Sequence, residues 1–228
     1  MNFNINHFIN TPIPDNISLE GWQEVHIEEC EEELTALYNI HPKITTNGDY
    51  LARKTVVNML IEASKLLPVD CSFLIRDGYR SFDVQKKFYD TFYDKVKNDS
   101  PNTSEAEIIK QVTKKVTYPS KNPPSPHFTG GAIDMTIIDK NNEKLNMLTS
   151  DDYSQSDNTA FIEQIFKNHS PSLELINVAI NRRLLYNIMT SIGFTNNPNE
   201  WWHYDFGNQF WAKIRGKKAI YGYIEEKK

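Results

Sequence analysis

The sequence predicts an α+β fold in which helices flank an antiparallel sheet. Apolar residues recur with helical spacing in some segments and alternate as in strands in others. Short strand patterns in the second half lack the regular alternation with helices that a parallel sheet requires. The 228 residues, 39% of them hydrophobic, are enough for one large domain with a sizeable core. We therefore expect a single domain over residues 1–228.

The first part of the chain is more polar than the rest. Residues 1–20 are rich in Asn and Pro, and we expect them to form an arm that lies on the domain. The acidic run at residues 28–33 is interpreted as a solvated face, because blocks of like charge are usually solvent-exposed. Cys30 and Cys71 are expected to be reduced thiols, with one disulfide between them as the alternative.

A helix and a strand are predicted next. After Asp49, apolar residues recur at helical spacing until Pro68, which ends the helix. Residues 71–76 then form a short apolar strand, and Asp77–Gly78 ends it.

Two further helices follow this strand. Ser81 is a favourable N-cap for the first of them. Ser104 and Glu107 form a capping-box pair at the start of the second. The apolar face of the first helix is expected to comprise Val84, Phe88, Phe92 and Val96.

The second half contains the clearest strand and the longest helix. Four prolines exclude a helix from residues 118–126. Residues 131–138 alternate as a strand, with Asp134 on the face opposite Ile133, Met135 and Ile137. Residues 174–192 form the long helix, which Gly193 ends. Residues 201–206 form a last strand, in which His203 and Asp205 share a face.

Two segments carry polar side chains that a packed core does not require. Asp134 interrupts an apolar strand, and a buried carboxylate must be paired, hydrated or bound to a metal. The glycines at 130–131 allow the backbone to turn so that His127 approaches Asp134. His203 adds a second imidazole, and two imidazoles with one carboxylate suit zinc with an open fourth position. Taken singly, each of these side chains could equally be a packed or surface residue.

Glu200 lies three residues before His203. On a regular strand, positions three apart point to opposite faces. Glu200 therefore has to lie in the preceding loop or at a bulge to reach the same site, and Pro198–Asn199 makes a loop plausible. We interpret Glu200 as a base for the attacking water rather than as a metal ligand, with an exposed loop carboxylate as the alternative.

Together these motifs resemble a known family. Ser-x-His followed by Asp seven residues later, then Glu-Trp-Trp-His, is similar to the zinc D-alanyl-D-alanine dipeptidases of the VanX type, within the D,D-carboxypeptidase/dipeptidase group (peptidase family M15). Asp-Gly-Tyr-Arg at residues 77–80 matches a further family segment, and residues 181–194 resemble the family's helix before Glu-Trp-Trp-His. The resemblance covers about residues 50–206 and implies a hedgehog/DD-peptidase-like fold.

The resemblance also implies roles for individual residues. It implies one zinc ion per chain, held by His127, Asp134 and His203, with Glu200 as general acid/base. It implies that Arg80 is a cation facing the scissile carbonyl. The implied substrate is the free D-alanyl-D-alanine dipeptide, a cell-wall precursor or recycling product. The weaker matches, both on the substrate side, are Asp152 for its ammonium group and Ser125 as a site-lining residue.

Composition and charge restrict the possible partners and location of the protein. The net charge of −5 argues against nucleic acid or an anionic membrane as the main partner. No apolar run approaches the roughly 18 residues of a membrane span. We expect a cytoplasmic protein because the N-terminus lacks a secretory pattern, with the periplasm as the alternative. The alternative functions are a D,D-carboxypeptidase or endopeptidase on peptidoglycan stem peptides, and a non-catalytic zinc-binding module. A module of that kind has no need of both Glu200 and Arg80.

Overall fold

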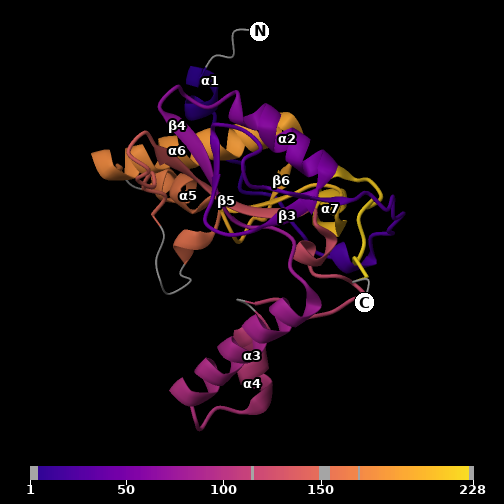
Figure 1. Cartoon of the computed structure of the whole chain (residues 1–228). Helices are drawn as coiled ribbons and strands as arrows, with labels where there is room; N and C mark the ends of the chain where they lie inside the picture. The colour runs from indigo at the N-terminus through magenta and orange to yellow at the C-terminus, as the bar shows by residue number, and fades with distance from the viewer. Residues whose placement is uncertain (1–4, 114–115, 149–154, 169, 226–228) are drawn as a thin grey trace.

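The computed structural model describes residues 5–113, 116–148, 155–168 and 170–225. Helices flank a five-stranded sheet, so the predicted α+β class is confirmed (Figure 1). In these ranges no helix is both long enough and apolar enough to cross a membrane.

The five-stranded sheet has the order β2-β4-β5-β7-β6. Its strands are β2 (Ile44–Thr46), β4 (Cys71–Asp77), β5 (Ala132–Asp139), β6 (Thr195–Asn196) and β7 (His203–Asp205). The β4–β5, β5–β7 and β6–β7 pairs are antiparallel as predicted, but β2 runs parallel to β4. The expected antiparallel sheet therefore has one parallel pair, at this edge. The chain crosses from β2 to β4 through a helix, and such a crossover returns the chain in the same direction.

A small two-stranded sheet precedes the first long helix. β1 (Leu34–Ala36) pairs with β3 (Leu51–Arg53) in antiparallel fashion. The predicted helix after Asp49 therefore begins only at Lys54, as α2 (Lys54–Ser64). Gly78 lies against β3, and a Cβ atom there would come within 2.5 Å of the Leu51 carbonyl oxygen. The glycine in the Asp-Gly-Tyr-Arg segment thus permits a close backbone contact.

The main core lies between the sheet and two helices, α2 and α6 (Leu173–Ile192). Leu60, Phe73, Ile133 and Ile188 are all fully buried there. α6 ends at Gly193, whose φ of 114° is a left-handed conformation, as predicted. Within the first 20 residues, α1 (Ile5–Asn10) is helical and packs on α6.

The α3–α4 hairpin, formed by α3 (Phe82–Asp99) and α4 (Glu105–Thr113), projects away from the sheet (Figure 1). Ser81 caps α3 as predicted, since its hydroxyl accepts a hydrogen bond from the Val84 N–H at 3.3 Å. The predicted apolar face of α3 was partly wrong. Val84 and Phe88 are 45% and 53% exposed, whereas Gln85 and Tyr89 are buried. Because α3 stands off the sheet, α4 covers only one side of it.

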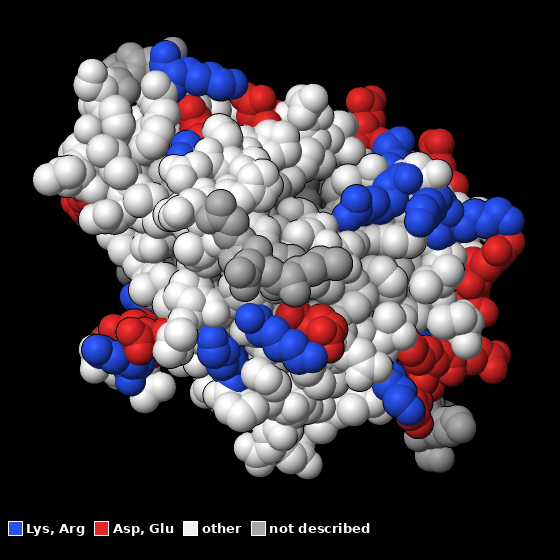
Figure 2. Space-filling view, turned by 90° about the horizontal axis from the view of Figure 1, so that it is seen from above, with Lys and Arg blue, Asp and Glu red and all other residues white. Residues whose placement is uncertain are grey.

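The remaining elements complete the body. They are the short helices η1 (Trp22–Glu24), η2 (Pro126–Thr129) and η3 (Gln155–Asp157), with α5 (Phe161–Asn168) and α7 (Gln209–Arg215). On the face of the molecule in Figure 2, basic and acidic side chains are interspersed. No charge of a single sign dominates that face.

Candidate metal centre

Three segments bring His127, Asp134 and His203 together. His127 lies in η2, Asp134 in β5 and His203 in β7, and the β5–β7 register places Asp134 opposite His203. One ligand atom from each residue lies within 4.8 Å of the other two. Among the residues that the structure describes, this is the only such group of three.

The η2 turn depends on two glycines. Gly130 has a φ of 69°, a left-handed conformation. A Cβ atom on Gly131 would lie 2.3 Å from the carbonyl oxygen of Phe206, so only glycine lets the turn approach this neighbouring backbone. These two positions explain how the chain reverses between His127 and Asp134.

In each imidazole, the nitrogen that points away from Asp134 has its own hydrogen-bond partner. His127 Nδ1 lies 2.7 Å from the Gly78 carbonyl oxygen, which can only accept a hydrogen bond. Nδ1 therefore carries the proton, and Nε2 faces Asp134 Oδ1 at 3.5 Å. His203 Nε2 lies 3.0 Å from Asp205 Oδ1, and its Nδ1 faces Asp134 Oδ1 at 2.9 Å.

This donor set fits a zinc ion. Each outward nitrogen has its own acceptor, an arrangement typical of metal-binding histidines. The inward nitrogen of each ring is therefore the one that could bind a metal ion, and at His203 a metal would replace the proton shared with Asp134. The set comprises two nitrogens and one oxygen on nearly buried side chains, which leaves a fourth coordination position for a water or substrate.

The charges at this centre are strongly coupled. Burial raises the pKa of the Asp134 carboxyl, but His127 and His203 lower that pKa further, to well below its usual value. Burial lowers the pKa of His203, but the carboxylates of Asp205 and Asp134 raise it to well above its usual value. The three side chains therefore form a concentrated set of opposite charges, and a cation bound by Asp134 would change these pKa values.

Glu200 lies in a turn directly before β7. Its N–H donates to the Asn197 carbonyl, and the His203 N–H donates to the Glu200 carbonyl, both at 3.1 Å. This turn places Glu200 Oε2 3.7 Å from His203 Nδ1, which a regular strand would not do. Burial raises the pKa of Glu200, and the charge of His203 opposes this shift.

Two asparagines hold this turn, and neither was assigned a role from the sequence. Asn197 Nδ2 donates to Glu200 Oε2 at 3.0 Å. Asn196 Nδ2 lies 2.9–3.3 Å from the carbonyl oxygens of Glu200, Trp201 and His203. The carboxylate is thus oriented by a side chain on its own loop.

Arg80 approaches the same centre from the end of β4. Its N–H donates to the His127 carbonyl at 3.2 Å, and its Nη2 lies 3.8 Å from Asp134 Oδ2. Its Nε donates to Asp77 Oδ2 at 2.7 Å, so the Asp-Gly-Tyr-Arg segment contains its own ion pair. Burial lowers the pKa of Arg80, but Asp77 and Asp134 raise it further, and the guanidinium stays charged.

The two substrate-side residues differ in what the structure shows. Ser125 is buried directly before η2, and its carbonyl oxygen accepts the Phe128 N–H at 2.9 Å. Asp152 lies outside the described residues. Asp205 was given no role from the sequence, although its position two residues after His203 on one strand face was a usable indication.

Comparison with known proteins identifies the family. Residues 35–217 match Peptidase_M15, described as D-ala-D-ala dipeptidase. A D-alanyl-D-alanine dipeptidase from Synechocystis sp. is 29% identical to the chain over 91% of its residues and 98% of the relative.

Two solved structures are weakly similar. One is a mutant of the vancomycin-resistance D,D-pentapeptidase VanY in complex with Zn(II), with a TM-score of 0.46 and 16% identity over 87% of this chain and 97% of that one. The other is VanYB in complex with D-alanine-D-alanine, also with a TM-score of 0.46 and 16% identity, over 92% of this chain and 90% of that one.

The family of the chain is given by the sequence match. Peptidases of this family are zinc-dependent, which agrees with the expected cofactor and the donor set. The expected family is confirmed: the chain belongs to the D-Ala-D-Ala dipeptidase family of M15 metallopeptidases.

Proposed function

We propose that this chain hydrolyses the free dipeptide D-alanyl-D-alanine with one zinc ion. The observation that supports this most is the convergence of Glu200 and Arg80 on a two-histidine, one-carboxylate group in a member of this family. A non-catalytic zinc module has no need of an oriented carboxylate and an oriented guanidinium beside the metal position.

In the proposed reaction each residue has one task. Zinc held by His127, Asp134 and His203 would act as a Lewis acid and would lower the pKa of the attacking water toward neutral pH. Glu200 takes the proton from that water and delivers it to the leaving amine nitrogen. Arg80 directs N–H donors toward the carbonyl oxygen as it becomes negatively charged.

Substrate size is the decisive test. Asp152 is proposed, on the resemblance alone, to pair with the free ammonium group of the dipeptide, and Ser125 to line the same side. An N-acetylated dipeptide lacks that ammonium and would leave the carboxylate without its partner. We expect the zinc-loaded protein to release D-alanine much faster from D-Ala-D-Ala than from N-acetyl-D-Ala-D-Ala or a stem pentapeptide.

Other outcomes favour the alternatives. Comparable kcat/KM values for the dipeptide and its N-acetyl form would indicate a D,D-carboxypeptidase. No release of D-alanine from any of these substrates by the zinc-loaded protein would indicate a non-catalytic module. Asp152→Asn should lower kcat/KM for D-Ala-D-Ala. It should also reduce the difference in kcat/KM between D-Ala-D-Ala and N-acetyl-D-Ala-D-Ala.

The proposed compartment is the cytoplasm. Both cysteines are free thiols, Cys30 exposed and Cys71 partly buried, which suits a reducing environment. The periplasm is the alternative, and fractionation of cells that express the native gene distinguishes the two.

A further inference from the structure

Arg80 is held on two sides by two different elements. Asp77, at the end of β4, contacts its Nε at 2.7 Å and its Nη2 at 2.5 Å. The α3–α4 hairpin contacts the rest of the guanidinium. Gln85 accepts a hydrogen bond from Nη1 at 2.9 Å, and the Phe88 ring centroid lies 5.3 Å from Cζ.

Gln85 uses both ends of its amide. Its Oε1 accepts from Arg80, and its Nε2 donates to the Thr117 carbonyl at 2.8 Å, where the chain returns from the hairpin. The side chain is 1% exposed, although its helix projects into solvent. A glutamine combines an acceptor for a guanidinium with a donor for a carbonyl, and an apolar residue offers neither.

Phe88 explains part of the unexpected exposure of α3. It lies three residues after Gln85, so the two side chains share one face of the helix. Phe88 is 53% exposed, yet its ring faces the guanidinium, and a cation over an aromatic face is attractive. Hydrogen bonds hold the nitrogens of the guanidinium, and its Cζ lies over the Phe88 ring.

The contacts leave few donors of Arg80 free. A guanidinium has five N–H groups, of which two engage Asp77 and one engages Gln85. One N–H on Nη1 and one on Nη2 remain, and Nη2 is the atom nearest Asp134. The orientation of these remaining donors is therefore fixed by the hairpin as well as by β4.

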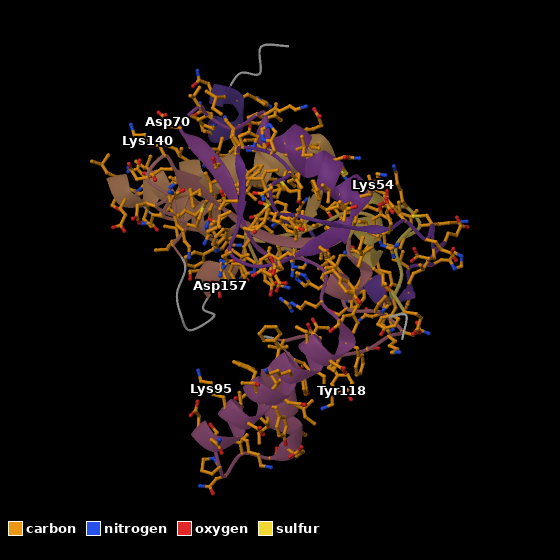
Figure 3. The ribbon with its side chains drawn as sticks, viewed as in Figure 1. Lys54, Asp70, Lys95, Tyr118, Lys140 and Asp157 are labelled. Atoms are coloured by element: carbon orange, nitrogen blue, oxygen red, sulfur yellow. The ribbon has the colours of Figure 1, made fainter. Side chains whose placement is uncertain are left out.

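We propose that Gln85 and Phe88 are positioning residues for Arg80, and that the α3–α4 hairpin thereby contributes to catalysis without touching the substrate. This inference rests on the proposed function, because it takes Arg80 as the donor to the scissile carbonyl. Figure 3 shows the hairpin, on which Lys95 is labelled, standing apart from the body that carries Asp157. The contacts to Arg80 give this separate element a connection to the metal centre.

A double-mutant cycle tests the proposal. Gln85→Met keeps the length of the side chain and removes both hydrogen bonds, and Phe88→Leu removes the aromatic face. In the otherwise unchanged, zinc-loaded protein we expect each to lower kcat for D-Ala-D-Ala about tenfold, with KM changed less than about twofold. Gln85→Glu should recover part of the loss, because its carboxylate still accepts from Arg80.

The same changes are then made in Arg80→Ala. If Gln85 and Phe88 act through Arg80, neither change should lower kcat further. Equal losses in both backgrounds would mean a general structural effect and overturn the inference. Tyr93→Phe, which removes a hydroxyl contact to Glu105 between α3 and α4, is the control and should stay within about twofold of wild type.

A spectroscopic measurement does not depend on turnover. NMR signals of the Arg80 guanidinium, assigned by their loss in Arg80→Ala, should be resolved and slowly exchanging in wild type. In Gln85→Met they should broaden or merge. Unchanged signals would overturn the inference even in an inactive protein. Unchanged kcat in Arg80→Ala would instead overturn the proposed role of Arg80, and the NMR result would still decide whether Gln85 positions it.

Discussion

The two nitrogens of each histidine at the metal centre face different partners. The outward nitrogen of His203 faces the fully buried carboxylate of Asp205, and that of His127 faces the carbonyl of Gly78. Asp205 also accepts a hydrogen bond from Asn208 at 2.5 Å, so its own position is fixed. Asp205 should therefore control the orientation and basicity of His203 without touching the metal.

The first prediction concerns this carboxylate. Asp205→Asn keeps the shape of the side chain and removes its charge, so His203 should become a weaker and less oriented ligand. We expect zinc affinity, measured by competition with a chelator, to fall about 10–100-fold while the fold is retained. Asp139→Asn is the matched control, because this partly buried carboxylate at the end of β5 accepts hydrogen bonds only from Asn141 and Glu143 among its described contacts. An unchanged zinc affinity in Asp205→Asn would exclude this role.

The second prediction separates proton transfer from metal binding. Glu200→Gln retains the size and the contact distance of the side chain but cannot accept a proton. We expect kcat to fall about 10²–10⁴-fold while zinc stays at one per chain. His203→Ala is the opposite case and should lose the zinc. If Glu200→Gln also lost its zinc, Glu200 would be a ligand, contrary to the assignment made here.

At the scale of single residues, the sequence identified the candidate metal ligands and the base better than it identified the residues that contact them. No single polar side chain was decisive, but the combined motifs predicted that His127, Asp134, Glu200 and His203 share a site. The structure brings these four side chains together. Gln85 could not be found in this way. Its importance depends on Arg80 and Thr117, which meet it only in the folded chain.

Among the elements, the acidic run at residues 28–33 does more than the sequence indicated. It is largely exposed, as interpreted, but Glu29 and Glu32 also bind the buried residues Arg53 and Tyr221. Glu29 pairs with the buried Arg53 at 3.1 Å. Glu32 accepts hydrogen bonds from the Thr55 N–H at 3.1 Å and from the Thr55 and Tyr221 hydroxyls, both at 2.5 Å. The run therefore joins the start of α2 to the C-terminal segment.

The third prediction tests this connection by stability. Glu32→Gln replaces an acceptor of three hydrogen bonds with an amide, and we expect the free energy of unfolding to fall by about 1–2 kcal/mol in denaturant titrations. Glu33→Gln is the control from the same run, because its ion pair with Lys54 is exposed. It should change stability by less than about 0.5 kcal/mol. Equal losses in the free energy of unfolding for Glu32→Gln and Glu33→Gln would contradict the role of Glu32 in joining α2 to the C-terminal segment.

The pH dependence of the same variant has a definite sign. Burial raises the pKa of Glu32, but hydrogen bonds from Thr55 and Tyr221 lower it more, so the folded-state pKa lies below the ordinary value of a glutamate. Such a group stabilises the fold above its unfolded pKa, and that stability is lost as the pH falls through the folded pKa. The difference between wild type and Glu32→Gln should therefore shrink in acid.

Element patterns predicted from the sequence were accurate where the apolar residues belong to the main core. β5, with Ile133, Met135 and Ile137 buried, and the Gly193 end of α6 are examples. They were inaccurate for α3, because an apolar spacing does not say whether a helix meets the sheet or stands away from it. The parallel pairing of β2 also depended on a distant strand, which a three-residue segment does not identify.

At the scale of the whole molecule, the body and the α3–α4 hairpin have separate cores. Tyr89, Ile108 and Val112 form a buried cluster within the hairpin, distinct from the main core. The metal centre, in contrast, joins η2, β5 and β7 within the body. A ligand that binds all three segments should therefore stabilise the body more than the hairpin.

The last prediction concerns metal removal. The proposed zinc ligands His127, Asp134 and His203 are brought together only in the folded chain, so chelation of zinc should lower the melting temperature. At free zinc 100 times its Kd, the stabilisation relative to the metal-free protein should be about 2.7 kcal/mol. Hydrogen exchange should show where this stabilisation acts. Amides of β5 and β7 should become more protected with zinc, whereas those of α4 should exchange by local opening at a rate that zinc hardly changes. His203→Ala should show neither effect. Equal protection of α4 and β5 by zinc would mean that the hairpin unfolds only together with the body.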